Sequence, residues 1–146
     1  MSKRTDVHAA AVALAEGACP DATVLGLDHD AAKPSAIPPG GLIIVRRGTL
    51  NPTGTDLSPP SYHYNHEIPI EIIFHDGPDA TADERVDAAM TAIGDAVLAD
   101  RHLGGLVDWL DAVPPDVDDV VTKGGQTATG ALTMLVASYA TPFPLH

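Results

Sequence analysis

An alternating stretch, residues 61–76 (SYHYNHEIPIEIIFHD), restricts the possible folds of this chain more than any other feature. Its even-numbered positions from 62 to 74 are aromatic, histidine or aliphatic, whereas most of its odd-numbered positions are polar. Successive side chains of an extended chain point to opposite sides, so the alternation predicts a strand with one apolar face. A helix would mix the two sets, and Pro69 in the middle of the run also disfavours one. The fold must therefore contain a strand of about 50 Å.

A strand of this length exceeds what one domain of 146 residues needs, so we expect it to bend or to leave the body of the domain. Pro69 predicts an edge position or a bulge, because proline cannot donate to a central ladder. We expect the half Ile68–Phe74 to belong to the core. The half Ser61–Glu67 is expected to reach another subunit, together with the long preceding loop Thr49–Pro60.

The polar side of this strand is expected to meet something outside the chain. Two arginines at the end of an apolar run that precedes the loop are added as candidates, because they are the one basic pair beyond the N-terminus. The candidate residues for a subunit interface, or for the wall of a lumen, are Ser61, His63, Asn65, Glu67, Glu71, Arg46 and Arg47.

The other segments predict an α+β fold in a single domain, residues 1–146. One helix is expected over Thr5–Glu16, and a second from the capping-box pattern at Thr81–Glu84 to about residue 100. Apolar runs predict strands at 23–27, 41–48, 106–113, 116–122 and 131–139, and a polar connection is expected over Asp28–Pro39. Together they indicate a mostly antiparallel sheet of four to five strands, with two helices packed on one face and a long projecting β-hairpin.

Charge restricts the partners of the chain. The formal net charge is −12, and residues 76–119 hold twelve acidic side chains against Arg85 and Arg101. An acidic surface without a large basic patch does not bind nucleic acid, but it can form a wall past which DNA slides. The sequence has no apolar run long enough to span a bilayer and no visible signal peptide, which predicts a protein made in a cytoplasm. Cys19 is the only cysteine, so no intrachain disulfide is expected.

Histidines in the long strand raise the question of a metal site, formed by His63, His66 and His75 with Glu67 and Glu71. Strand parity argues against it, because His63 and His66 point to opposite faces, and His63 and Glu67 lie about 13 Å apart on one face. Glu67 and Glu71 are separated in the same way, which disfavours a catalytic carboxylate pair.

Other motifs of catalysis and ligand binding are missing from the sequence. Phosphate-binding glycine loops and the GxSxG nucleophile motif do not occur. The acidic run at 116–119 lacks the glycine and the distal glutamate of a calcium loop. We therefore expect no metal, no cofactor and no catalytic residue, and a protein that is not an enzyme.

Several segments in this order resemble the tail-terminator proteins of long-tailed bacteriophages and of related phage-derived tails. The resemblance covers most of the chain: an N-terminal helix, GLIIVRRG at 41–48, and the long strand that leads into a capped helix. It continues through LADRHLGGLV at 98–107 and closes on LVASYAT at 135–141. The segment between the first helix and the hairpin is longer here than is usual in that family.

The resemblance implies a structural virion protein whose copies close into a ring of six. Such a ring caps the tail tube at the head-proximal end, stops polymerisation of the major tail tube protein, and offers a surface to head-completion and neck proteins. Genomic DNA would pass through the ring without specific binding, and assembly would take place in the host cytoplasm. Two alternatives stay open: a head-tail connector or neck protein of the same assembly, and a small enzyme that uses the histidine-rich strand.

Overall fold

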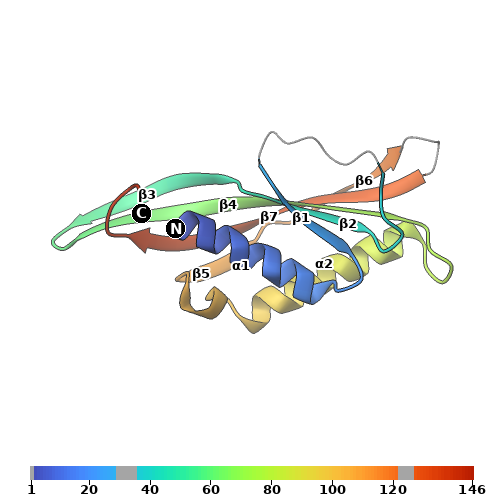
Figure 1. Cartoon of the computed structure of the whole chain (residues 1–146), viewed down its shortest axis with the longest axis horizontal. Helices are drawn as coiled ribbons and strands as arrows, with labels where there is room; N and C mark the ends of the chain where they lie inside the picture. Colours follow the sequence, from blue (N-terminus) through green and yellow to red (C-terminus); the bar gives the residue numbers. More distant parts are fainter. Residues whose placement is uncertain (1, 29–35, 122–126) are drawn as a thin grey trace.

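Seven strands and two α-helices build the chain in the computed structural model, which describes residues 2–28, 36–121 and 127–146 (Figure 1). The expected α+β class is confirmed: the sheet is mostly antiparallel and open, and among the described strands only β1 and β2 pair in parallel. The elements are α1 (Lys3–Ala18), β1 (Thr23–Leu27), β2 (Leu42–Arg46), β3 (Thr49–Leu57), β4 (Pro60–His75), α2 (Ala82–Ala99), a 3-10 turn (Leu103–Gly105), β5 (Trp109–Ala112), β6 (Asp116–Val121) and β7 (Thr127–Thr141). Most of the expected Asp28–Pro39 connection lies outside the described residues.

Two long antiparallel strands, β4 and β7, form the middle of the sheet, in register from Tyr62 opposite Thr141 to His75 opposite Ala128. On the side that does not face the other long strand, each of them pairs with two shorter strands that lie one after the other. β2 and then β3 pair with β4, whereas β5 and β6 pair with β7. The prediction of one very long strand at residues 61–76 is confirmed by β4, which spans sixteen residues.

Thr49–Pro60 is a strand and a tight turn, so the prediction of a long loop there was wrong. β3 runs to Leu57, which pairs with Pro60 across the turn. β3 shows no alternation in its sequence because neither of its faces is buried from Pro52 onward, and its pairing register shifts between Pro52 and Gly54. With β3 included, the sheet has seven strands, whereas the sequence predicted four to five.

Pro69 lies in a central strand, in contrast to the edge position or bulge predicted for it. On one side β4 pairs with β7 in regular register. On the other side the pairing with β3 ends at Glu67 and the pairing with β2 begins at Ile70. Residues 68 and 69 therefore face Arg46–Gly48, the short crossing between β2 and β3. No strand pairs regularly with β4 at this point, so no backbone hydrogen bond to it depends on the N–H that proline lacks.

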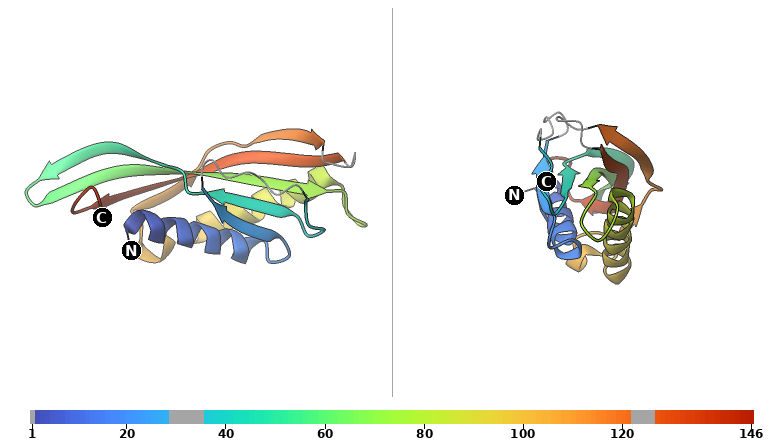
Figure 2. Two further views of the ribbon diagram at one scale, coloured as in Figure 1. Left: turned by 45° about the horizontal axis from the view of Figure 1, so that its top comes forward. Right: turned by 90° about the vertical axis from the view of Figure 1, so that its right-hand side faces the viewer.

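Both helices cover the same face of the sheet (Figure 2). The even-numbered residues of β4 point to this face, and Ile68, Ile70 and Ile72 are fully buried there. From the helices the core receives Val7, Ala11 and Ala15 of α1 and Val86, Ala89, Ile93 and Val97 of α2. The predicted split of the strand is thus confirmed for its core half. No helix among the described residues has the length and apolar character needed to cross a membrane.

A projecting arm extends from this body: β3 and the segment Pro60–Glu67 of β4, with the end of β7 alongside (Figure 1). In the figure it leaves the helices at the left, while β6 lies at the opposite end of the molecule. The predicted projecting hairpin is therefore present, with a tight tip at residues 58–59.

Gly94 offers a test of the helical layer, because it lies inside α2 and an added Cβ would meet nothing within 4 Å. Gly94→Ala should raise the free energy of unfolding by about 0.5–1 kcal/mol, since alanine loses less backbone entropy in a helix. Urea denaturation measures the change. As a control, Gly26→Ala should not stabilise, because its Cβ would lie 3.1 Å from the His8 ring and 3.2 Å from Val12. An unchanged or lower stability of Gly94→Ala would contradict this view of α2.

Candidate functional site

The sheet face opposite the helices carries most of the residues selected from the sequence. Five odd-numbered residues of β4 are half-buried on this helix-free face: Ser61, His63, Asn65, Glu67 and Glu71. The structure thus places them in one line that runs from the arm into the body. The two arginines lie at the crossing between β2 and β3, and each has a separate set of contacts.

Arg46 and Glu71 form an ion pair within the body. The Arg46 Nε lies 2.8 Å from Glu71 Oε2, and the two side chains are 9% and 16% exposed. The Arg46 guanidinium also donates to the backbone carbonyl of Asp28 through Nη1, at 2.9 Å. These contacts tie β2 to β4 and to the end of β1. Arg46 therefore offers little surface to a partner, although its sequence position suggested that role.

Polar side chains on the arm pair with one another across the strands. His63 Nε2 lies 2.9 Å from Asp56 Oδ2 and links β4 to β3. Ser138 donates from its hydroxyl to Asn65 Oδ1 at 2.8 Å and links β7 to β4. Leu57 at the tip is 84% exposed. The surface that the arm offers to another molecule is therefore its tip and the outer edge of β3, which pairs only with β4 among the described strands.

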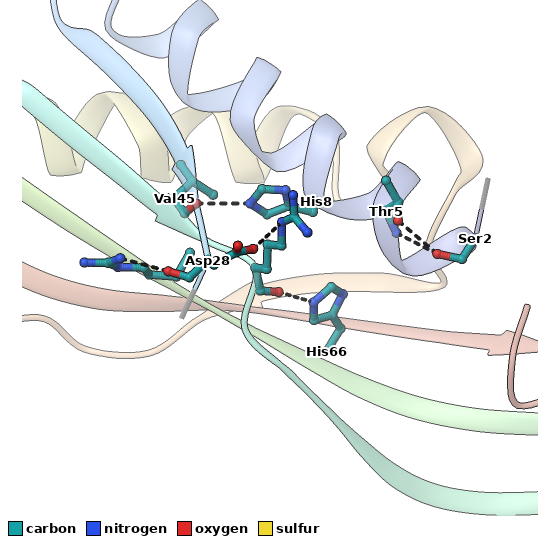
Figure 3. A network of polar contacts seen from close by, with 8 residues as sticks. Ser2, Thr5, His8, Asp28, Val45 and His66 are labelled. Atoms are coloured by element: carbon teal, nitrogen blue, oxygen red, sulfur yellow. Dashed lines mark hydrogen bonds and ion pairs between the residues drawn. The ribbon is translucent and has the colours of Figure 1, made fainter. Parts of the chain in front are cut away.

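The crossing between β2 and β3 is held by side chains from three elements (Figure 3). His8 of α1 lies with Nε2 3.0 Å from the Val45 carbonyl. Arg47 pairs through Nε with Asp28 Oδ1 at 2.9 Å, and both side chains are exposed. His66 of β4 donates from Nε2 to the Arg47 carbonyl at 2.6 Å. Gly48 follows with a φ of 76°, in contact with the backbone of Glu67.

His66 is the residue whose role was missed from the sequence. It was weighed as a metal ligand, but it is completely buried on the core face, and its Nδ1 accepts from the Tyr139 hydroxyl at 3.1 Å. Burial lowers the pKa of the His66 ring, opposed by the hydrogen bond to the Arg47 carbonyl. One signal was available: His66 is the only histidine among the apolar, even-numbered positions of the strand.

Tyr139 yields a test at alkaline pH, because burial raises the pKa of its hydroxyl to about 12. The ordinary value is about 10, so this group contributes stability that is full below pH ~10 and is lost as the pH rises through about 12. At pH ~11 the wild type should have lost about 1.4 kcal/mol that Tyr139→Phe does not lose. Urea unfolding at pH ~9 and ~11 measures this difference. Tyr62→Phe, a half-buried tyrosine of the arm, should follow the wild type; equal losses in all three proteins would contradict the prediction.

The histidines of β4 do not converge on a metal site. His63 and His66 lie on opposite faces of the sheet, as strand parity predicted. Among the described residues, no group of three or more His, Cys, Asp or Glu side chains is placed to hold a metal ion.

Comparison with known proteins bears on the fold. No protein-family model matches the chain, and no curated protein matches it in sequence. Twenty-four chains of solved structures match in fold. One of them comes from the virion of a native gene transfer agent (GTA) particle, with a TM-score of 0.50 and 14% sequence identity, over 90% of this chain and 93% of that one. The fold of this chain is thus one that a virion particle also contains.

Proposed function

We propose that this protein is a structural component of a virion: a tail terminator whose copies form a ring of six. The ring would cap the tail tube at its head-proximal end, stop polymerisation of the tube protein and present a surface to head-completion proteins. DNA would pass through its centre. The protein would act by assembly and would not be an enzyme. The fold likeness to a chain of the gene transfer agent virion supports the class of protein, and the resemblance in sequence supports the tail terminator within that class.

The projecting arm is the observation that carries this proposal. Closed rings are built from heterologous contacts, in which one surface of a subunit meets a different surface of the next. The arm leaves the body with an unpaired β3 edge, within the described residues, and with an exposed apolar tip at Leu57. An open edge can take up a strand from a neighbouring chain. The candidates Ser61, His63, Asn65 and Glu67 lie on this arm and would line the contact or the lumen.

Acidic side chains away from the arm support the proposed passage of DNA. Asp83, Glu84 and Asp87 of α2 are exposed, as are Asp116, Asp118 and Asp119 of β6. A channel wall of this charge repels the phosphate backbone, so DNA does not adhere while it passes.

Shortening the arm tests the assembly. Residues 55–62 would be removed and Gly54 joined to His63 by an Asn-Gly turn, since these two residues face each other across β3 and β4. Native mass spectrometry with purified tail tubes should show hexamers of the wild type and monomers of the shortened protein, with the body still folded by circular dichroism. Leu98→Ser, an exposed position on α2, is the matched control and should assemble normally. A wild type that stays monomeric and does not bind tubes would contradict the proposal, as would a shortened protein that still forms rings.

Deletion of the gene separates the terminator from a head-tail connector. Loss of a terminator should leave overlong tails, because nothing stops the tube. Loss of a connector should leave tails of normal length that never join heads. Electron microscopy of the deletion strain measures tail length directly. Tails of normal length would contradict the terminator and favour the head-tail connector. An enzyme would instead lose all turnover when His63, His66 and His75 are replaced by alanine.

A further inference from the structure

Two strands at opposite ends of the molecule have an unpaired edge. β3 pairs only with β4, and β6 pairs only with β7, within the part of the chain that the structure describes. Figure 1 shows β3 on the arm and β6 at the other end of the body. Residues 52–57 of β3 and 116–119 of β6 are exposed on both faces of their strands. Each strand thus offers backbone donors and acceptors with which a further strand can pair.

Charge distinguishes the two ends. Arg4 and His8 of α1 and Arg47 of the crossing line a hollow of about 90 Å³, which we call the basic hollow. Figure 3 shows the start of α1 beside the crossing. Arg4 is exposed and has no ion-pair partner among the described residues. The segment 116–119 of β6 holds three aspartates and no basic residue, so its charge is opposite to that of the hollow.

The basic hollow lies at the end of the open β3 edge. β2 and β3 follow one another along the same side of β4. In the body, β1 covers β2 as far as Leu27, which lies opposite Arg46. Beyond the crossing no described strand covers β3, so a strand that pairs there would continue the line of β1 and reach Arg47. β3 has nine residues and β6 has six, so β6 of another copy fits along this edge.

We propose that β6 of one copy pairs along the open β3 edge of a second copy, with Asp119 directed to the basic hollow. The inference rests on the proposed ring and names the two surfaces that meet in it. The surfaces differ and lie at opposite ends of the chain, so every copy gives one and receives one, as a closed ring requires. Two β6 edges would instead bring like charges together, which disfavours their pairing.

Strand parity selects Asp119 among the aspartates of β6. Asp119 pairs with Thr129 of β7, and Thr129 lies opposite Phe74 of β4, which belongs to the core beneath the helices. Asp119 therefore points to the helix-covered side of the sheet, where the basic hollow lies beside α1. A sheet that continues across the contact keeps its two faces. Asp116 and Asp118 point to the helix-free face and stay available for the channel wall proposed above.

Charge reversal on each surface tests the contact. Arg4→Glu/Arg47→Glu reverses the hollow, and Asp119→Arg reverses the strand. By native mass spectrometry with purified tail tubes, each variant alone should be monomeric where the wild type is hexameric. An equimolar mixture of the two should form rings again, because every contact in an alternating ring then joins opposite charges. Asp118→Arg is the matched control: it makes the same change of charge on the opposite face and should still form hexamers.

Cross-linking locates the contact without a change of charge. A benzophenone amino acid in place of Val117, which is exposed on β6, should link to residues 49–57 of another copy, identified by mass spectrometry of mixed isotope-labelled protein. The same group in place of Leu98 on α2 should not.

Three results would overturn the contact between β6 and β3 and leave the ring proposal intact. They are reversed variants that each still form hexamers, a mixture of them that stays monomeric, and links from position 117 to a segment other than β3. A wild type that forms no hexamers on tubes would contradict the ring itself, and the contact with it.

Discussion

Gly48→Ala should lower the free energy of unfolding by about 3 kcal/mol, and this is the largest effect we expect from a single methyl group. The backbone at Gly48 has a φ of 76°, in the left-handed region that favours glycine. A Cβ there would overlap the carbonyl of Glu67, which belongs to the backbone of the central strand and cannot turn aside. The crossing between body and arm would have to move away from β4. Urea unfolding gives the magnitude.

Gly54→Ala is the matched control for that variant. Gly54 lies on β3 a few residues further along, and a Cβ built on it meets nothing within 4 Å. Its stability should stay within about 0.5 kcal/mol of the wild type. If Gly48→Ala lost no more than Gly54→Ala, the close approach of the crossing to β4 would be wrong.

Glu71→Gln should cost about 2 kcal/mol by weakening the ion pair inside the body. Arg46 is 8% exposed, so water cannot fully replace the carboxylate at 2.8 Å, and an amide leaves the guanidinium charge less well balanced. The Asp28 carbonyl still accepts from Arg46 and limits the loss. Thermal and urea unfolding measure the effect.

Arg47→Met provides the contrast for the buried pair. The ion pair of Arg47 with Asp28 has a similar distance, 2.9 Å, but its side chains are 59% and 68% exposed. Its loss should cost less than about 1 kcal/mol, because water screens exposed charges. The double variant Arg46→Met/Glu71→Leu should recover most of the stability that Glu71→Gln loses, since it removes both charges of the pair together. Equal costs for Glu71→Gln and Arg47→Met would contradict the different burial of the two pairs.

Local periodicity carried the sequence predictions that the structure confirms. The alternation over residues 61–76 predicted which face of β4 is buried, and the Thr81–Glu84 pattern predicted the start of α2, where Thr81 accepts from the Glu84 N–H at 3.3 Å. Prediction failed where a segment lacks a buried face. β3 has no periodic pattern because both of its sides are exposed from Pro52 onward, and its extended form depends on pairing with β4. Local sequence could not reveal that partner.

By itself, the sequence determined the α+β class, the long strand at residues 61–76, its core half and the opposite orientation of His63 and His66, because these follow from the geometry of neighbouring residues. Only the tertiary structure decided that Pro69 lies opposite a crossing, that Arg46 is paired with Glu71, and that His66 and Tyr139 meet. The two side-chain contacts among these features join residues 25 and 73 positions apart. Their cause is the register between distant strands, which no local pattern in the chain encodes.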